Sequence, residues 1–146
     1  MKLLKLSEQL GELMTEDGYT RLTLAQAMNT NAAKFLGFMK DESFPSFCTF
    51  LSLTEFFHCS ADFLIGLSDY PKREARYSPA PPFCKQLNKL MLAEKLSIYE
   101  LHAGTGLSDS VIRKWLKGQL LPSLPSLLRL VQFLDYPLDY ILGRIT

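Results

Sequence analysis

The polar groups best suited to chemistry lie in one short stretch of the sequence, GLSDSVIRKWLKG, which runs from Gly106 to Gly118. Hydroxyl and carboxylate side chains gather at its start, and three cations follow towards its end. Such groups donate and accept hydrogen bonds and neutralise anions. Nowhere does the sequence join a histidine to a nucleophile in a pattern that supports catalysis. The stretch therefore predicts a binding surface, and the protein is expected not to be an enzyme.

A short helix must present these groups. Ser108 is a suitable N-cap for it, and Gly118 is a suitable end. Val111, Ile112 and Trp115 have the spacing of an apolar stripe that faces inward. Trp115 is therefore expected in the core, and the polar side chains are expected on the opposite face.

Four more short helices are predicted around this one, between residues 83 and 146. The first is PFCKQLNKLMLAEK, and the second is capped by Ser97, with Glu100 closing a capping box. The second helix is predicted to end where two glycines interrupt it, between Gly104 and Gly106. Ser123 caps PSLPSLLRLVQFL, and LDYILG is the last helix. No alternating apolar and polar run is long enough for a strand, so the chain is expected to be all-α.

The sequence also repeats itself at an offset of 77 residues without a gap. From Leu6 to Leu67, 13 of 62 positions are identical to their counterparts, and many apolar positions match as well. Between the copies, the segment SDYPKREARYSPAPP holds four prolines, which stiffen the backbone. The expected architecture is two tandem five-helix domains, residues 1–67 and 83–146, joined by a proline-rich linker over residues 68–82.

The run from Leu96 to Gly143 resembles the Cro and lambda-repressor-like XRE family of helix-turn-helix transcriptional regulators. The resemblance lies in Leu-Ser before the second helix, Glu-Leu within it, Gly-Leu-Ser at the turn, Lys-Gly after the third helix, Pro-Ser before the fourth and a Leu-Asp-x-Ile-Leu-Gly close. It covers most of residues 83–144, and residues 6–67 resemble the same family more distantly through the repeat. The resemblance implies a lambda-repressor-like helix-turn-helix fold for both domains.

The resemblance further implies that Ser108 to Lys117 is a recognition helix that lies in the major groove of double-stranded DNA. Family positions carried over to this sequence give three residues that read base edges: Asp109, Ser110 and Lys114. Four others are expected to grip the DNA backbone: Ser108, Arg113, Lys117 and Gln119.

The first domain lacks these groups. The counterparts of Asp109, Ser110, Arg113 and Lys114 at the 77-residue offset are Ala32, Ala33, Leu36 and Gly37. Their side chains neither hydrogen-bond a base nor neutralise a phosphate. The prediction here is an apolar interaction surface, which would pair with its copy in a dimer, pack on the second domain or receive a protein partner. Its expected members are Met28, Ala33, Leu36 and Gly37, and the alternative is that a small register shift buries Leu36.

These features predict a sequence-specific, double-stranded DNA-binding transcription regulator of the repressor-like kind. One helix-turn-helix module buries little surface on DNA, so a homodimer is expected. Residues 1–67 carry 5 cations and 8 acidic side chains, whereas residues 83–146 carry 8 and 5. The alternative is a protein-interaction adaptor, antitoxin-like or antirepressor, that keeps the fold without binding DNA. A net charge of +1, and Ile98 where such families often place glutamine, favour that alternative.

Composition predicts a folded, cytoplasmic protein. Apolar residues make up 47% and charged residues 21%, as in soluble globular proteins. No apolar run approaches the ~18 residues of a membrane span, and an early glutamate interrupts any signal-peptide core, so no membrane association is expected. Cys48, His58 and Cys59 would lack a fourth metal ligand, and Cys84 stands apart from them. Core thiols are expected, with neither a metal nor a cofactor.

Overall fold

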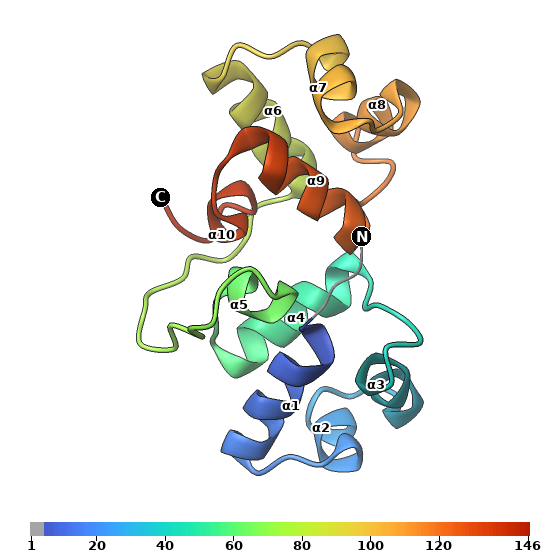
Figure 1. The fold of residues 1–146 in the computed structure, drawn as a ribbon, viewed down its shortest axis with the longest axis vertical. Coiled ribbons are helices and arrows are strands. Elements are labelled where there is room, and N and C mark those ends of the chain that lie inside the picture. The colour runs from blue at the N-terminus through green and yellow to red at the C-terminus, as the bar shows by residue number, and fades with distance from the viewer. Residues whose placement is uncertain (1–4) are drawn as a thin grey trace. The chain divides into compact units, whose positions relative to one another are not determined.

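The computed structural model describes residues 5–146, and over that range it contains ten α-helices and no strand (Figure 1). The expectation of an all-α fold is therefore confirmed. The chain divides into two compact units, Met1–Ala75 and Arg76–Thr146. Within the described residues, no helix has both the length and the apolar character that a membrane span requires.

The first unit is built from α1 (Leu6–Asp17), α2 (Arg21–Ala27), α3 (Ala32–Met39), α4 (Phe47–Phe57) and α5 (Ala61–Ile65). Helix α1 packs against α3 and α5, and α2 packs against α3. The core is rich in phenylalanine, because α3, α4 and α5 all turn such side chains inward. Its fully buried rings are Phe35, Phe50, Phe57 and Phe63.

The second unit is built from α6 (Phe83–Ala93), α7 (Ile98–Thr105), α8 (Asp109–Leu116), α9 (Leu124–Leu134) and α10 (Leu138–Ile141). Helix α6 packs against α8 and α10, and α7 packs against α8 and α9. Aliphatic side chains dominate this core. Those without measurable exposure include Leu87, Leu101, Ile112, Leu127 and Leu130.

The helix starts of the two units keep a constant spacing. Each helix of the first unit begins 77 residues before a helix of the second, from Leu6 and Phe83 to Ala61 and Leu138. The left-handed backbone positions that end helices or form turns follow the same spacing. The five pairs are Gly18 with Lys95, Asn29 with Gly106, Asp41 with Gly118, His58 with Asp135, and Gly66 with Gly143. The two units thus have the same helix order and the same turn geometry.

The proline-rich segment is bonded to both units along its length. Pro71 accepts a hydrogen bond from the Ser60 amide at 2.8 Å, and Ala75 accepts one from the His58 ring at 2.8 Å, both within the first unit. In the second unit, the Ser78 amide donates to the Arg144 carbonyl at 2.8 Å. The Arg144 guanidinium lies over the Tyr77 ring and pairs with Asp139, and both ends of that ion pair are buried. Backbone and side-chain bonds therefore hold this segment in addition to its prolines.

Candidate nucleic-acid interface

The turn that leads into α8 is held by side chains of α7. Ser97 and Glu100 form the predicted capping box at the start of α7, and Gly106 ends the helix in the left-handed region, with φ 76°. The Leu107 amide donates to Thr105 Oγ1 at 3.1 Å, and His102 Nδ1 donates to the Leu107 carbonyl. His102 is half-buried against this turn. Its imidazole joins the helix to the turn that sets the direction of α8.

The prediction that the helix ends at Gly104 is wrong, because α7 continues through Thr105. Gly104 is glycine for a packing reason. A Cβ added there would lie 2.0 Å from a ring carbon of Phe133 in α9. The absent side chain allows α7 and α9 to pack closely beneath the turn.

Two of the three residues in the predicted apolar stripe of α8 lie in the core, and the third, Val111, is half-buried. Ile112 and Trp115 are buried, and the Trp115 ring meets the Phe83 ring of α6 edge to face, with centroids 5.9 Å apart. Among the described residues, no partner lies within hydrogen-bonding distance of the buried Trp115 Nε1. Burial on this side fixes which side chains of α8 point to solvent.

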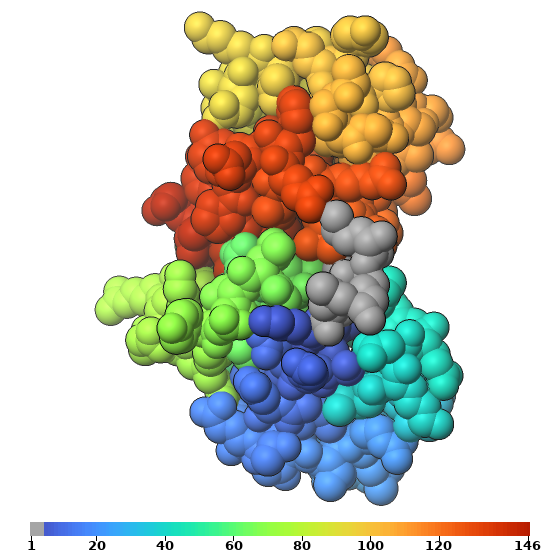
Figure 2. Space-filling model, viewed as in Figure 1, coloured from blue at the N-terminus to red at the C-terminus, as the bar shows by residue number. Residues whose placement is uncertain are grey.

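The predicted DNA-contact residues lie on α8 and directly beside its two ends. The side chain of Ser108 caps α8 by accepting from the Val111 amide at 3.3 Å. After α8, the Gln119 amide donates to the Lys114 carbonyl at 2.9 Å, which brings the next segment back against the helix end. All seven predicted residues are exposed: Ser108, Asp109, Ser110, Arg113, Lys114, Lys117 and Gln119. The surface of α7 and part of α8 is visible in yellow to orange in Figure 2.

Charge along α8 is arranged with the helix dipole. Asp109 lies in the first turn, whereas Arg113 and Lys114 lie in the last. Arg113 also reaches back one turn, and its Nη2 lies 3.4 Å from Asp109 Oδ2. The two side chains are 56% and 52% exposed, so both can reach a ligand in solution. With Lys117, the face has three cations and one carboxylate.

The corresponding face of α3 differs from its prediction as an open apolar surface. Ala33 is exposed, whereas Met28, Leu36 and Gly37 are half-buried. A Cβ at Gly37 would lie 2.5 Å from Ser43 Oγ, and the Glu42 amide donates to the Gly37 carbonyl at 2.9 Å. The segment after α3 therefore folds over Gly37.

Larger apolar side chains of the first unit are exposed elsewhere, at positions that sequence reasoning missed. They include Leu22 in α2, 61% exposed, and Phe44 before α4, 41% exposed. Their counterparts at the 77-residue offset, Tyr99 and Leu121, are exposed as well. The signal was present in the repeat, because apolar residues occupy the same two positions in both copies.

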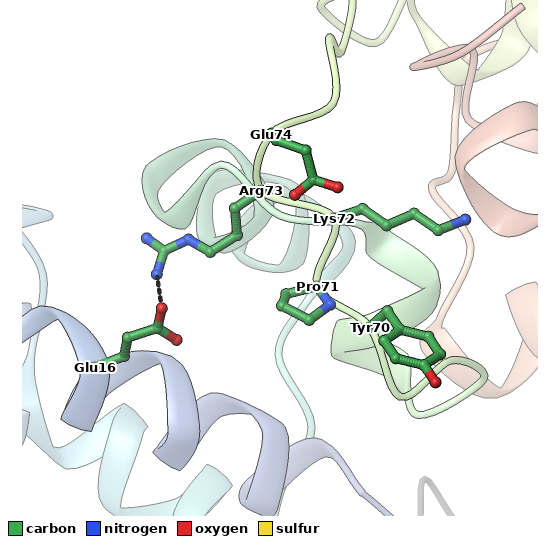
Figure 3. A pocket seen from close by; sticks show the side chains of 6 residues that line it. All are labelled: Glu16, Tyr70, Pro71, Lys72, Arg73 and Glu74. Atoms are coloured by element: carbon green, nitrogen blue, oxygen red, sulfur yellow. Dashed lines mark ion pairs between the residues drawn. The ribbon is translucent and has the colours of Figure 1, made fainter.

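The first unit has an open pocket of about 460 Å³ beside the end of α1 (Figure 3). Glu16 and the segment from Tyr70 to Glu74 line it, and Glu16 pairs with Arg73 at 3.5 Å.

Among the described residues, no group of three histidine, cysteine, aspartate or glutamate side chains lies close enough to hold a metal ion. Cys59 is buried and Cys84 is half-buried, but Cys48 is exposed, so the expectation of a core thiol is wrong there.

Comparison with known proteins addresses the second unit. Residues 87–141 match a helix-turn-helix family model. The match contains α7, α8, α9 and α10 in full, together with most of α6. Over these residues, the second unit is thus similar to helix-turn-helix domains. No curated protein and no solved structure matches the chain.

Within the matched region, α7, residues 106–108 and α8 follow one another in the order of a helix-turn-helix motif, with α8 as the second helix. The second helix of such a motif is the one that enters the major groove. The exposed polar face of α8 is therefore the candidate nucleic-acid interface.

Proposed function

We propose that the protein is a sequence-specific, double-stranded DNA-binding transcription regulator of the repressor-like kind, and that α8 enters the major groove. The observation that carries this proposal is the exposure of seven polar side chains on and beside α8, within the region that matches the helix-turn-helix model. Three of them are cations, which release counterions when they meet phosphates.

The chain is proposed to hold two tandem copies of this fold, joined through residues 68–82. The constant 77-residue spacing of helix starts and left-handed turns supports this arrangement. The first copy is assigned to dimerisation or partner binding and not to reading DNA. Ala32, Ala33, Leu36 and Gly37 stand where the second unit has polar groups, and acidic Asp41 and Glu42 follow the Lys40 that caps α3.

A second copy of the chain would supply the second half-site. One helix-turn-helix module contacts few base pairs, and a dimer doubles both the phosphate contacts and the readout. The exposed Leu22 and Phe44 are the largest apolar groups near α2 and α3 that such an assembly could cover.

The alternative function is a protein-interaction adaptor, antitoxin-like or antirepressor, with the same fold. Two observations favour it. Ile98, the first residue of α7, is apolar where a glutamine would touch the DNA backbone, and Asp109 places a negative charge on the face of α8. Neither group attracts a phosphate.

Binding of the full chain to pooled random duplexes at low salt, followed by selection and sequencing, separates the two functions. The double variant Arg113→Ala/Lys114→Ala removes two cations from α8. The matched control, Lys85→Ala/Lys89→Ala, removes two exposed cations from α6 and leaves α8 intact.

A regulator enriches a half-site motif and binds with a steep dependence on salt. We expect the α8 variant to lose the motif and the α6 variant to retain it. If the native chain enriches no sequence and shows no salt-dependent binding to duplex, the adaptor function replaces this proposal.

A further inference from the structure

A carboxylate on a DNA-binding face is unfavourable, because DNA is itself negatively charged. Asp109 lies in the first turn of α8, the part of a recognition helix that approaches the bases, and its side chain is half exposed. Phosphates repel it, and most groove edges present acceptors that it cannot bond. The cost is reduced if the carboxylate organises a neighbouring cation.

Arg113 is that neighbour. It lies one turn after Asp109 on the same side of α8, and long side chains in a helix lean towards its N-terminus. Here the guanidinium leans back far enough for Nη2 to lie 3.4 Å from Asp109 Oδ2. The carboxylate engages one nitrogen, and the remaining donors of the fork are available to a ligand.

We propose that Arg113 reads a guanine in the major groove and that Asp109 is the positioning residue that holds its guanidinium. This inference rests on the proposed function and reverses the roles that the family resemblance implies for the two residues. A guanidinium matches the O6 and N7 acceptors of guanine with two parallel hydrogen bonds, the commonest specific contact in the major groove. The preferred DNA would therefore contain a guanine at one defined position of each half-site.

The first unit lacks both residues of this pair. Its counterparts of Asp109 and Arg113 are Ala32 and Leu36, so the carboxylate and the guanidinium are absent together. Lys117 differs, because its counterpart Lys40 keeps the charge. The lysine at the end of the third helix is thus present in both units, whereas Asp109 and Arg113 are both replaced in the first.

The test is to select bound DNA from pooled random duplexes with the full chain and with four variants, and to sequence it. Arg113→Ala should abolish the guanine preference at one position, a loss of roughly 10- to 100-fold in discrimination, and leave the other positions unchanged. Asp109→Ala should weaken the preference at that same position while binding to random duplex increases, because a negative charge is gone. Asp109→Glu keeps a carboxylate within reach and should restore the preference, and Lys117→Ala should weaken all sequences alike.

The outcomes separate the two levels of the proposal. A native chain that enriches no motif overturns the proposed function and this inference together. A native motif that persists in Arg113→Ala, with uniform weakening like that of Lys117→Ala, overturns the inference alone. A loss of cytosine preference in Asp109→Ala, at a position that Arg113→Ala does not affect, would show that Asp109 reads a base directly and would also overturn it. Thermal unfolding of each variant should stay close to that of the native chain, because exposed ion pairs contribute little to stability.

Discussion

Arg73 and Asp17 form an ion pair with two parallel hydrogen bonds, from Nη1 to Oδ1 at 2.8 Å and from Nη2 to Oδ2 at 2.6 Å. Nε of the same guanidinium donates to the carbonyl of Phe57 at 3.1 Å. One side chain therefore joins the end of α1, the end of α4 and the segment that follows α5. The hydrogen bond from Arg73 also lowers the pKa of the Asp17 carboxyl.

Replacing Arg73 with alanine should lower the free energy of unfolding of the first unit by about 1–2 kcal/mol, because three charge-assisted hydrogen bonds are lost at a site that is three-quarters covered. Urea unfolding at pH 7 measures this change. Arg76→Ala, which removes an exposed cation from the same segment, is the control and should change stability by less than about 0.5 kcal/mol. Equal effects of the two substitutions would show that the ion pair contributes nothing specific.

The stabilisation from Asp17 should disappear in acid. Its pKa is lower in the folded protein than in the unfolded chain, so its contribution is complete above the unfolded value of about 4 and is lost as pH falls through the folded value. The native chain should therefore be more stable than Asp17→Asn at pH 7, and the difference should shrink as the pH falls below about 4. Urea unfolding of both proteins across this range tests the sign, and a difference that grows in acid would contradict it.

Trp115→Phe should be tolerated far better than Trp115→Ala. Phenylalanine removes the unpartnered Nε1 donor and keeps a ring against Phe83, and the counterpart of Trp115 in the first unit is Phe38. We expect a loss of less than about 1.5 kcal/mol for phenylalanine and about 3–5 kcal/mol for alanine, which leaves a large cavity. Chemical unfolding measures both, and equal losses would mean that the indole nitrogen has a partner in solution.

Gly104→Ala should destabilise the second unit although alanine favours helices by up to about 1 kcal/mol. The added methyl group would overlap the Phe133 ring, so α7 and α9 must separate or the ring must move, at a cost of about 1–3 kcal/mol. A double-mutant cycle that combines Gly104→Ala with Phe133→Ala tests whether overlap with the Phe133 ring causes this loss of stability. In the Phe133→Ala background, Gly104→Ala should become neutral or stabilising, and an unchanged penalty would place the strain elsewhere.

Association through the first unit should depend on its exposed apolar side chains. Leu22→Ser/Phe44→Ser removes two of them, and light scattering at several protein concentrations should show a shift towards monomer. Leu92→Ser is the matched control, because Leu92 is 80% exposed but lies in α6 of the second unit. If both variants associate as the native chain does, these side chains form no interface between copies.

Local signals made the helices of the second unit predictable. Ser97, Ser108 and Ser123 each accept a hydrogen bond from the backbone amide three residues later, as their positions before apolar runs suggested. The polar face of α8 followed from the same reasoning, because burial of Ile112 and Trp115 leaves one orientation for the rest of the helix.

Contacts between distant residues were not predictable in this way. Arg73 and Asp17 are 56 residues apart, and a charged segment rich in proline gives no indication of which acid it meets. Gly104 was misinterpreted for the same reason, since a glycine before a turn indicates a break unless the ring packed against it is known. The half-burial of Leu36 and Gly37 depends on where the segment after α3 folds.

The constant 77-residue spacing has a consequence for folding. Two units with equally spaced helix starts in one chain invite the exchange of a helix between them, a common misassembly of neighbouring similar domains. Their cores oppose that exchange, because Phe35 and Phe50 in one unit correspond to Ile112 and Leu127 in the other. A helix inserted into the wrong unit would leave a void or overfill the space. The difference in side-chain volume is therefore expected to disfavour such an exchange.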